Sequence, residues 1–145
     1  MRPGIVILFI FISLLSCTKD SLNRIPEAFV NYRITIQEFN IKNKNGLLVV
    51  EKMNNTGVAG LLIYRRADKA FVAFDRCSSV NPQSRCAVVP DDPNLTATDP
   101  CSGAKFSLFD GSAVKAPAKR PLKEYRVLIS NFDISVVNWY GSRQN

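Results

Sequence analysis

Short runs of β-branched and aromatic residues, separated by turn-forming residues, dominate the hydrophobic pattern of this chain. Residues 29–36 alternate apolar and polar positions after their start, as in a strand with one buried face. No stretch keeps helical spacing over several turns. The pattern therefore predicts an all-β domain of about nine or ten strands, in a sandwich or small barrel. The expected strands are residues 29–36, 47–52, 60–65, 70–74, 86–89, 95–98, 106–109, 125–130 and 134–139.

The loops of this predicted domain are unevenly distributed. Residues 66–69 and 130–131 are short polar segments between predicted strands, and they indicate hairpin connections. Residues 75–121 lack regular alternation and contain three of the four Cys and six of the eight Pro. This region is therefore expected to be built largely from loops.

The N-terminus has the pattern of a secretory signal. Arg2 supplies a positive charge, residues 5–15 are nearly all apolar, and Leu14-Leu15-Ser16-Cys17 follows. The apolar run is shorter than the about 20 residues that a membrane-spanning helix needs. The tetrad resembles the lipobox of bacterial lipoproteins, which implies cleavage before Cys17 and attachment of fatty acyl chains such as palmitate to Cys17.

This resemblance implies a division of the chain and a location. We expect a signal peptide over residues 1–16, a lipidated tether over residues 17–27 and a β domain over residues 28–145. Several acyl chains on Cys17 would anchor the domain durably in a membrane of the bacterial cell envelope. Thr18 rather than Asp follows the Cys, which favours the outer membrane over the inner one by similarity to the sorting rule of some bacterial lipoproteins.

Composition narrows the classes of function. The 145 residues include 19 Lys and Arg, 12 Asp and Glu and no His, for a net charge of +7. Without His, the chain alone cannot form a Ser-His-Asp or Cys-His catalytic system, or a His-ligated zinc or haem site.

The basic residues lack the interleaved aromatic residues of a groove that binds single-stranded nucleic acid, so we expect no nucleic-acid partner. One basic group is interpreted as a solvated face, with an acidic partner or a lipid headgroup as the alternative. This group comprises Lys115, Lys119, Arg120, Lys123 and Arg126.

The three Cys of the loop-rich region are Cys77, Cys86 and Cys101. In an exported protein their default chemistry is a disulfide, which leaves one thiol unpaired. All three pairings are open from the sequence: Cys86 with Cys101, Cys77 with Cys101, or Cys77 with Cys86. Closing a loop of about 15 residues would stabilise the domain by roughly 3 kcal/mol.

Four segments of this region resemble Rieske-type 2Fe–2S domains in order and spacing. They are residues 71–77 (FVAFDRC), 99–112 (DPCSGAKFSLFDGS), 116–118 (APA) and 121–127 (PLKEYRV). The chain is similar above all to lipid-anchored, Rieske-like bacterial proteins. The resemblance implies small antiparallel sheets with two loops projecting at one end, and it favours a disulfide between Cys86 and Cys101 that bridges those loops.

The resemblance also implies which positions correspond to cluster ligands. A Rieske centre binds one iron with two Cys and the other with two His. Carried over by position, the ligands of the first loop fall on Cys77 and Ser79, and those of the second loop on Asp99 and Ser102. One ligand of four is retained. We therefore expect a domain without a cofactor, and without catalytic activity, that serves as a binding or structural module for an unidentified envelope partner.

Two other functions remain open. Zinc or an atypical 2Fe–2S cluster could be bound by Cys77, Cys86, Asp99 and Cys101. A cluster at these residues would make the protein an electron carrier. Alternatively, Cys77 could be a reactive thiol whose thiolate is stabilised by the adjacent Arg76.

Overall fold

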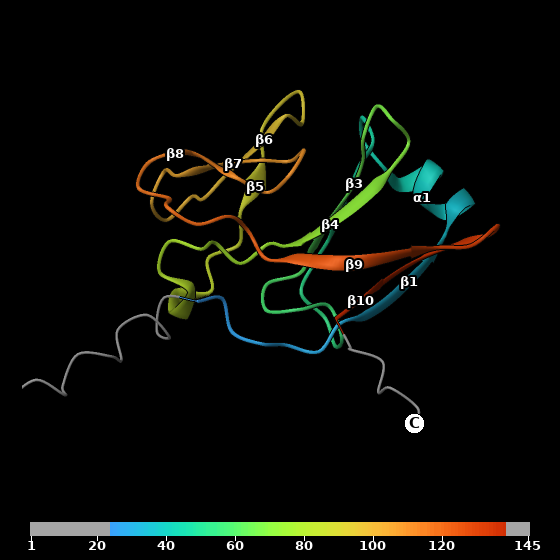
Figure 1. Cartoon of the computed structure of the whole chain (residues 1–145), viewed down its shortest axis with the longest axis horizontal. Coiled ribbons are helices and arrows are strands. Elements are labelled where there is room, and N and C mark those ends of the chain that lie inside the picture. Colours follow the sequence, from blue (N-terminus) through green and yellow to red (C-terminus); the bar gives the residue numbers. More distant parts are fainter. Residues whose placement is uncertain (1–23, 139–145) are drawn as a thin grey trace, which may run out of the picture.

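The computed structural model describes residues 24–138 as two antiparallel sheets and one short helix (Figure 1). The six-stranded sheet has the order β1-β10-β9-β4-β3-β2, and the four-stranded sheet has the order β5-β6-β7-β8. The strands are β1 (Asn31–Thr35), β2 (Leu47–Val50), β3 (Leu61–Arg65), β4 (Phe71–Asp75), β5 (Val89–Pro90), β6 (Thr96–Thr98), β7 (Lys105–Ser107), β8 (Ala113–Lys115), β9 (Glu124–Ile129) and β10 (Asp133–Val137). The all-β prediction is confirmed, and so are hairpin connections at residues 66–69 and 130–131.

The six-stranded sheet closes around its own core. Its two three-stranded halves are joined where β9 pairs with the end of β4, at Ala73 opposite Tyr125 and Phe74 opposite Glu124. Inward side chains of both halves meet in one apolar cluster, among them Ile63 of β3 and Ile134 of β10, and both are fully buried. In β1, the alternation that predicted the strand is thus the alternation between this core and the outer surface.

The four-stranded sheet covers the outer face of β3 and β4. Leu62 and Phe74 point away from the first core and form a second cluster with Phe106 and Leu108. Residues 61–63 of β3 are therefore all buried, because apolar layers lie on both of its faces. This packing fixes the small sheet, and with it the loops that join the two sheets, against the end of β4.

Three elements differ from the expectation. The strand expected over residues 86–89 is reduced to β5 (Val89–Pro90), because residues 86–88 belong to the loop and make a single bridge, from Ala87 to Cys77. Residues 36–42 form the helix α1 (Ile36–Lys42), so the first predicted strand ends at Thr35. Thr35 caps this helix, because its hydroxyl accepts a hydrogen bond from the Glu38 N–H at 3.0 Å. Strand β8 was not predicted, and its residues are partly or fully exposed.

No helix within residues 24–138 is long and apolar enough to cross a membrane. The expected signal peptide 1–16, the expected acylation site Cys17 and the end of the last predicted strand at residue 139 lie outside the described residues.

Candidate functional site: the two loops at the end of β4

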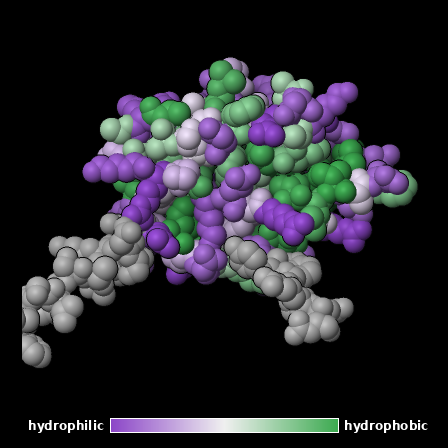
Figure 2. Space-filling model, in the orientation of Figure 1, coloured by the Kyte–Doolittle hydropathy of each residue, from purple (hydrophilic) through white to green (hydrophobic). Residues whose placement is uncertain are grey.

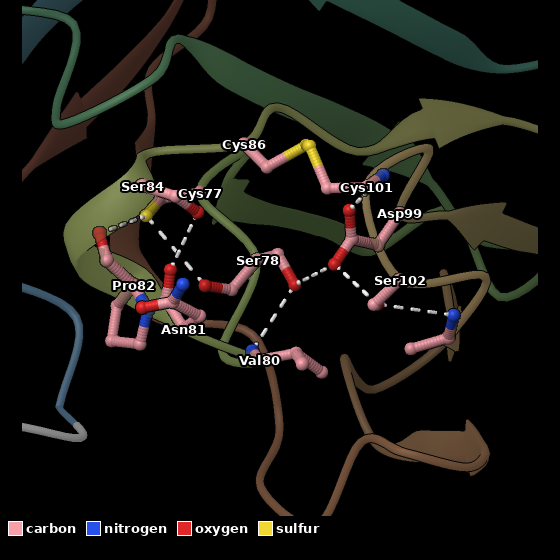
Figure 3. Close-up of a disulfide and its surroundings, with 11 residues drawn as sticks. Cys77, Ser78, Val80, Asn81, Pro82, Ser84, Cys86, Asp99, Cys101 and Ser102 are labelled. Carbon is pink, nitrogen blue, oxygen red and sulfur yellow. Dashed lines mark hydrogen bonds between the residues drawn. A yellow bond between two sulfur atoms is a disulfide. The ribbon is translucent and has the colours of Figure 1, made fainter.

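Two loops meet beyond the end of β4, where the resemblance places the cluster ligands. The first loop follows β4 and runs over residues 76–88, with a 3-10 helix at Pro82–Ser84. The second loop joins β6 to β7 over residues 99–104. A disulfide between Cys86 and Cys101 connects the loops, with 6.4 Å between the two Cα atoms (Figure 3). This is the pairing that the resemblance favoured.

Asp99 is the centre of a hydrogen-bond network between the loops (Figure 3). Its Oδ2 accepts hydrogen bonds from the hydroxyls of Ser78, at 2.7 Å, and Ser102, at 2.6 Å. Its Oδ1 accepts a hydrogen bond from the Cys101 N–H at 2.8 Å. Asp99 is almost completely buried. Burial alone would raise the pKa of its carboxyl, but the hydrogen bonds from Ser102, Ser78 and the backbone outweigh burial and lower the pKa. Asp99 is therefore a satisfied carboxylate that links the two loops.

Cys77 is a fully buried thiol on the other side of the first loop. Its Sγ lies 3.6 Å from the Pro82 carbonyl oxygen and 3.7 Å from the Ser78 carbonyl oxygen. Burial raises the pKa of Cys77 to about 12, and the negative charge of Asp75 adds to the effect. The adjacent Arg76 does not act on this thiol as expected, because its guanidinium forms an ion pair with Glu51 at 2.7 Å. The thiol is thus held in the protonated form, which is a poor nucleophile.

The four ligand positions inferred from the resemblance do not point to one centre. Asp99 and Ser102 contact each other, but the Ser79 hydroxyl donates a hydrogen bond to the Arg120 carbonyl oxygen at 2.6 Å instead. The side chain that meets Asp99 from the first loop is Ser78, which the sequence interpretation missed. Ser78 and Ser79 are adjacent and chemically identical, so nothing in the sequence distinguishes them.

A second buried carboxylate, Asp75, ties the first loop to the six-stranded sheet. It accepts hydrogen bonds from the backbone N–H groups of Val58 (2.6 Å), Ala59 (3.1 Å) and Cys77 (2.8 Å), and from the Tyr125 hydroxyl (2.7 Å). Burial and the charge of Asp75 raise the pKa of Tyr125, so its hydroxyl keeps the proton that it donates. The sequence interpretation missed this network as well.

Gly57 provides the space that the Asp75 network needs. A Cβ atom on Gly57 would lie 2.3 Å from Asp75 Oδ2, and its φ of +78° is one that side-chain-bearing residues rarely adopt. Glycine at this position therefore allows residues 57–59 to approach the carboxylate closely.

The residues at this end do not fit a Rieske 2Fe–2S centre. The potential ligand atoms of Cys86, Asp99 and Cys101 lie within 4.8 Å of one another, and Cys77 is not part of this group. The two sulfurs are bonded to each other, so neither is a thiolate, and the Asp99 oxygens already accept three side-chain and backbone hydrogen bonds. The chain contains no His to bind the second iron. Within residues 24–138, the arrangement links the two loops and leaves no open set of ligands at this end.

Comparisons with solved structures agree with this architecture. No family model and no curated protein matches the chain. The plasma membrane Rieske protein PetC3 of the cyanobacterium Synechocystis PCC 6803 superposes with a TM-score of 0.55 at 22% identity, over 77% of this chain and 100% of that one. The ferredoxin of carbazole 1,9a-dioxygenase from Nocardioides aromaticivorans IC177 superposes with a TM-score of 0.50 at 16% identity, over 74% of this chain and 97% of that one. The chain therefore has a Rieske-like fold.

Proposed function

We propose that this protein is a lipid-anchored domain of the bacterial cell envelope that has a Rieske-like fold, carries no 2Fe–2S cluster and acts as a binding or structural module. The observation that carries this proposal is the Asp99 network. The carboxylate occupies the position that the sequence resemblance assigns to a cluster Cys, and its oxygens accept hydrogen bonds from Ser78, Ser102 and the backbone of Cys101. Side chains that form hydrogen bonds with one another across the two loops leave none of their atoms free to act as a metal ligand.

The residues support a structural role for this end of the domain. A disulfide and a buried carboxylate connect the same two loops, and a second buried carboxylate connects the first loop to the sheet. These contacts hold the loop surface in one shape, as a preformed binding surface requires.

Metal and sulfide analysis tests the loss of the cluster. We expect protein purified without oxygen to be colourless, to lack stoichiometric iron and acid-labile sulfide, and to give no electron paramagnetic resonance signal after reduction. A cluster-bearing Rieske protein, prepared in parallel, controls for loss of cluster during purification. Stoichiometric iron with sulfide in this chain would contradict the proposal.

The second candidate function is electron transfer through a metal centre with unusual ligands. It is favoured by the proximity of Cys86, Asp99 and Cys101, whose ligand atoms lie within 4.8 Å. Such a centre requires that the disulfide be reduced, because only thiolates bind iron or zinc at these sulfurs. Iron in the wild-type protein that disappears in an Asp99→Ala variant would favour this candidate.

Anchoring at Cys17 is the second part of the proposal. It is supported by the apolar run at residues 5–15 and by the small residue before Cys17. Mass spectrometry of the N-terminal peptide, from protein made in a bacterial host, is expected to show cleavage before Cys17 and acyl chains on it. A Cys17→Ser variant is expected to lose both changes, and an unmodified Cys17 in the wild type would refute the anchor.

A further inference from the structure

Two adjoining cavities open at the loop end of the domain. The first has a volume of about 310 Å³ and the second about 220 Å³, and both are lined by Ser79 and Arg120. The first cavity is also lined by Arg24 and Lys123, and the second by Lys119. We call this surface the basic face. It is defined by Arg24, Ser79, Lys119, Arg120 and Lys123.

The basic face carries an excess of positive charge. Four of the residues that line its two cavities are cationic, and another, Glu27, is acidic. Glu27 forms an ion pair with Lys123 at 2.7 Å, so it neutralises that one cation. Arg24, which lines the first cavity, and Lys119, which lines the second, are both exposed. Such a surface attracts phosphate groups, which Arg and Lys bind through charge-assisted hydrogen bonds.

The chain reaches the domain at this same face. Arg24 lines the first cavity, Ile25 packs against the small cluster of Val58, Ala59 and Cys77, and the Pro26 carbonyl oxygen accepts a hydrogen bond from Lys123. Figure 2 shows hydrophilic side chains beside the start of the described chain. The entry of the chain is thus fixed on the basic face.

The position of the entry determines which surface lies near an anchored membrane. Seven residue steps separate Cys17 from Arg24, so they span at most about 25 Å when fully extended. An anchor at Cys17 therefore keeps the basic face within that distance of the lipid surface. A short tether of this kind raises the effective concentration of the face at the membrane.

We propose that the basic face docks onto anionic phospholipid headgroups of the membrane that carries the anchor, with lipid phosphates at the mouths of its two cavities. The inference rests on the proposed lipid anchor. Each cation near an anionic membrane surface favours binding by about fivefold, and salt weakens the attraction. The loop end then faces the membrane, and α1 and the β3–β4 hairpin face away from it.

Labelling of lysines by an amine-reactive reagent tests this orientation. Full-length protein, made in a bacterial host and purified from its membranes, is placed in nanodiscs of phosphatidylcholine alone or with about one third phosphatidylglycerol. We expect labelling of Lys119 to fall at least about threefold in the anionic discs and to recover in roughly 0.5 M sodium chloride, where the Debye length is under about 5 Å. Lys42 in α1 and Lys69 in the β3–β4 turn are the controls, and their labelling should not change.

A variant and its matched control sharpen the test. Arg24→Gln is expected to remove at least about half of the protection of Lys119, because it removes one cation from the same face. Arg65→Gln removes an exposed cation at the far end of β3 and should leave the protection unchanged. Equal labelling of Lys119 in neutral and anionic discs would overturn the proposal. The proposal would also be overturned if dissolved inorganic phosphate, without lipid, protected Lys119 from labelling as strongly as anionic nanodiscs do. The cavities would then bind a free anion.

The failures of the two proposals can be told apart. If Cys17 is acylated but Lys119 is labelled equally in both kinds of nanodisc, the lipid anchor is supported and docking by the basic face is refuted. Unmodified Cys17 with salt-sensitive protection of Lys119 would refute the anchor and support the basic face.

Discussion

The six-stranded sheet and the loop end of this domain are stabilised by different forces. Side chains such as Ile63 and Ile134 form the core of the sheet by apolar burial, without direction or charge. At the loop end, Asp75 and Asp99 are both buried, and each is surrounded by hydrogen-bond donors. An apolar core tolerates the loss of one methyl group, whereas a buried acceptor that is removed leaves several donors unsatisfied. Single substitutions should therefore act unequally in the two regions.

Removal of Asp75 should have the largest effect. Asp75→Ala leaves three backbone N–H groups and the Tyr125 hydroxyl without an acceptor, and each unsatisfied group costs about 1–3 kcal/mol. We expect urea unfolding to show a loss of about 4 kcal/mol or more. If Asp75→Ala does not fold, Asp75→Asn serves in its place. It keeps one side-chain oxygen as an acceptor, so it should fold with a smaller loss of stability.

Asp68 offers a control for this experiment. Its carboxylate is exposed in the β3–β4 turn and accepts a hydrogen bond from the Ala70 N–H at 2.9 Å. Asp68→Ala should cost no more than about 1 kcal/mol. Similar losses for the two Ala variants would show that the Asp75 network does not hold the loop end to the sheet.

Loss of the disulfide should rank second. Cys86→Ser opens a loop of 15 residues, and the chain-entropy account gives a loss of about 3 kcal/mol. Cys77→Ala removes a free thiol and should cost about 1 kcal/mol. The stabilities of both variants are measured by thermal unfolding. Within residues 24–138, the folded wild type should also expose no thiol that reacts readily, because burial keeps Cys77 protonated. Equal melting temperatures for the two variants would contradict the pairing.

Asp99 should give a smaller effect that depends on pH. Its folded-state pKa is lowered, so its contribution to stability is complete above the unfolded value of about 3.9 and is lost as the pH falls through the folded value. Asp99→Asn should cost about 1–2 kcal/mol at pH 7, where the charge strengthens its hydrogen bonds.

A pH titration of stability checks the origin of that effect. Between about pH 5 and pH 2, the wild type should lose more stability than Asp99→Asn, which cannot titrate at this position. Asp91 also has a lowered pKa through its hydrogen bonds to Thr96, Lys105 and Thr98, which outweigh its burial, and its contribution should persist in the variant. Parallel curves for the two proteins would refute the role of the Asp99 charge.

The sheet core should show the smallest effect. Ile63→Val removes one methyl group from a fully buried position, and such changes cost about 1 kcal/mol. Urea unfolding should show this loss without a pH dependence, in contrast to Asp99→Asn. A loss that equals that of Asp75→Ala would remove the distinction between the two regions.

Regular alternation made the sheet predictable, and the lack of it hid the loop end. Residues 29–36 alternate because one face of β1 meets the core, and the short apolar run at 61–63 is buried on both faces. Helix α1 escaped prediction because seven residues are too few for helical spacing to emerge. Strand β8 escaped because it buries no side chain fully.

The contacts of the candidate site depend on residues that are distant in the sequence. Ser78 meets Asp99 across 21 positions, and Asp75 meets Tyr125 across 50. No periodicity encodes such contacts, since they arise when strands from different parts of the chain pair. The spacing of the Cys left three pairings open, and the Cys86–Cys101 bridge was favoured by resemblance to a family alone.

Lys123 has a mechanical consequence. Its ammonium group contacts the Pro26 carbonyl oxygen and Glu27, and it lies 5.8 Å from the centre of the Tyr125 ring, while the Tyr125 hydroxyl donates to Asp75. A force that pulls on the N-terminal end of the chain would reach Lys123 before it reaches any strand. Tension would be borne first by the packing of Ile25 and then by the Lys123 contacts, which can break and re-form before the hydrogen bonds of the sheet are loaded.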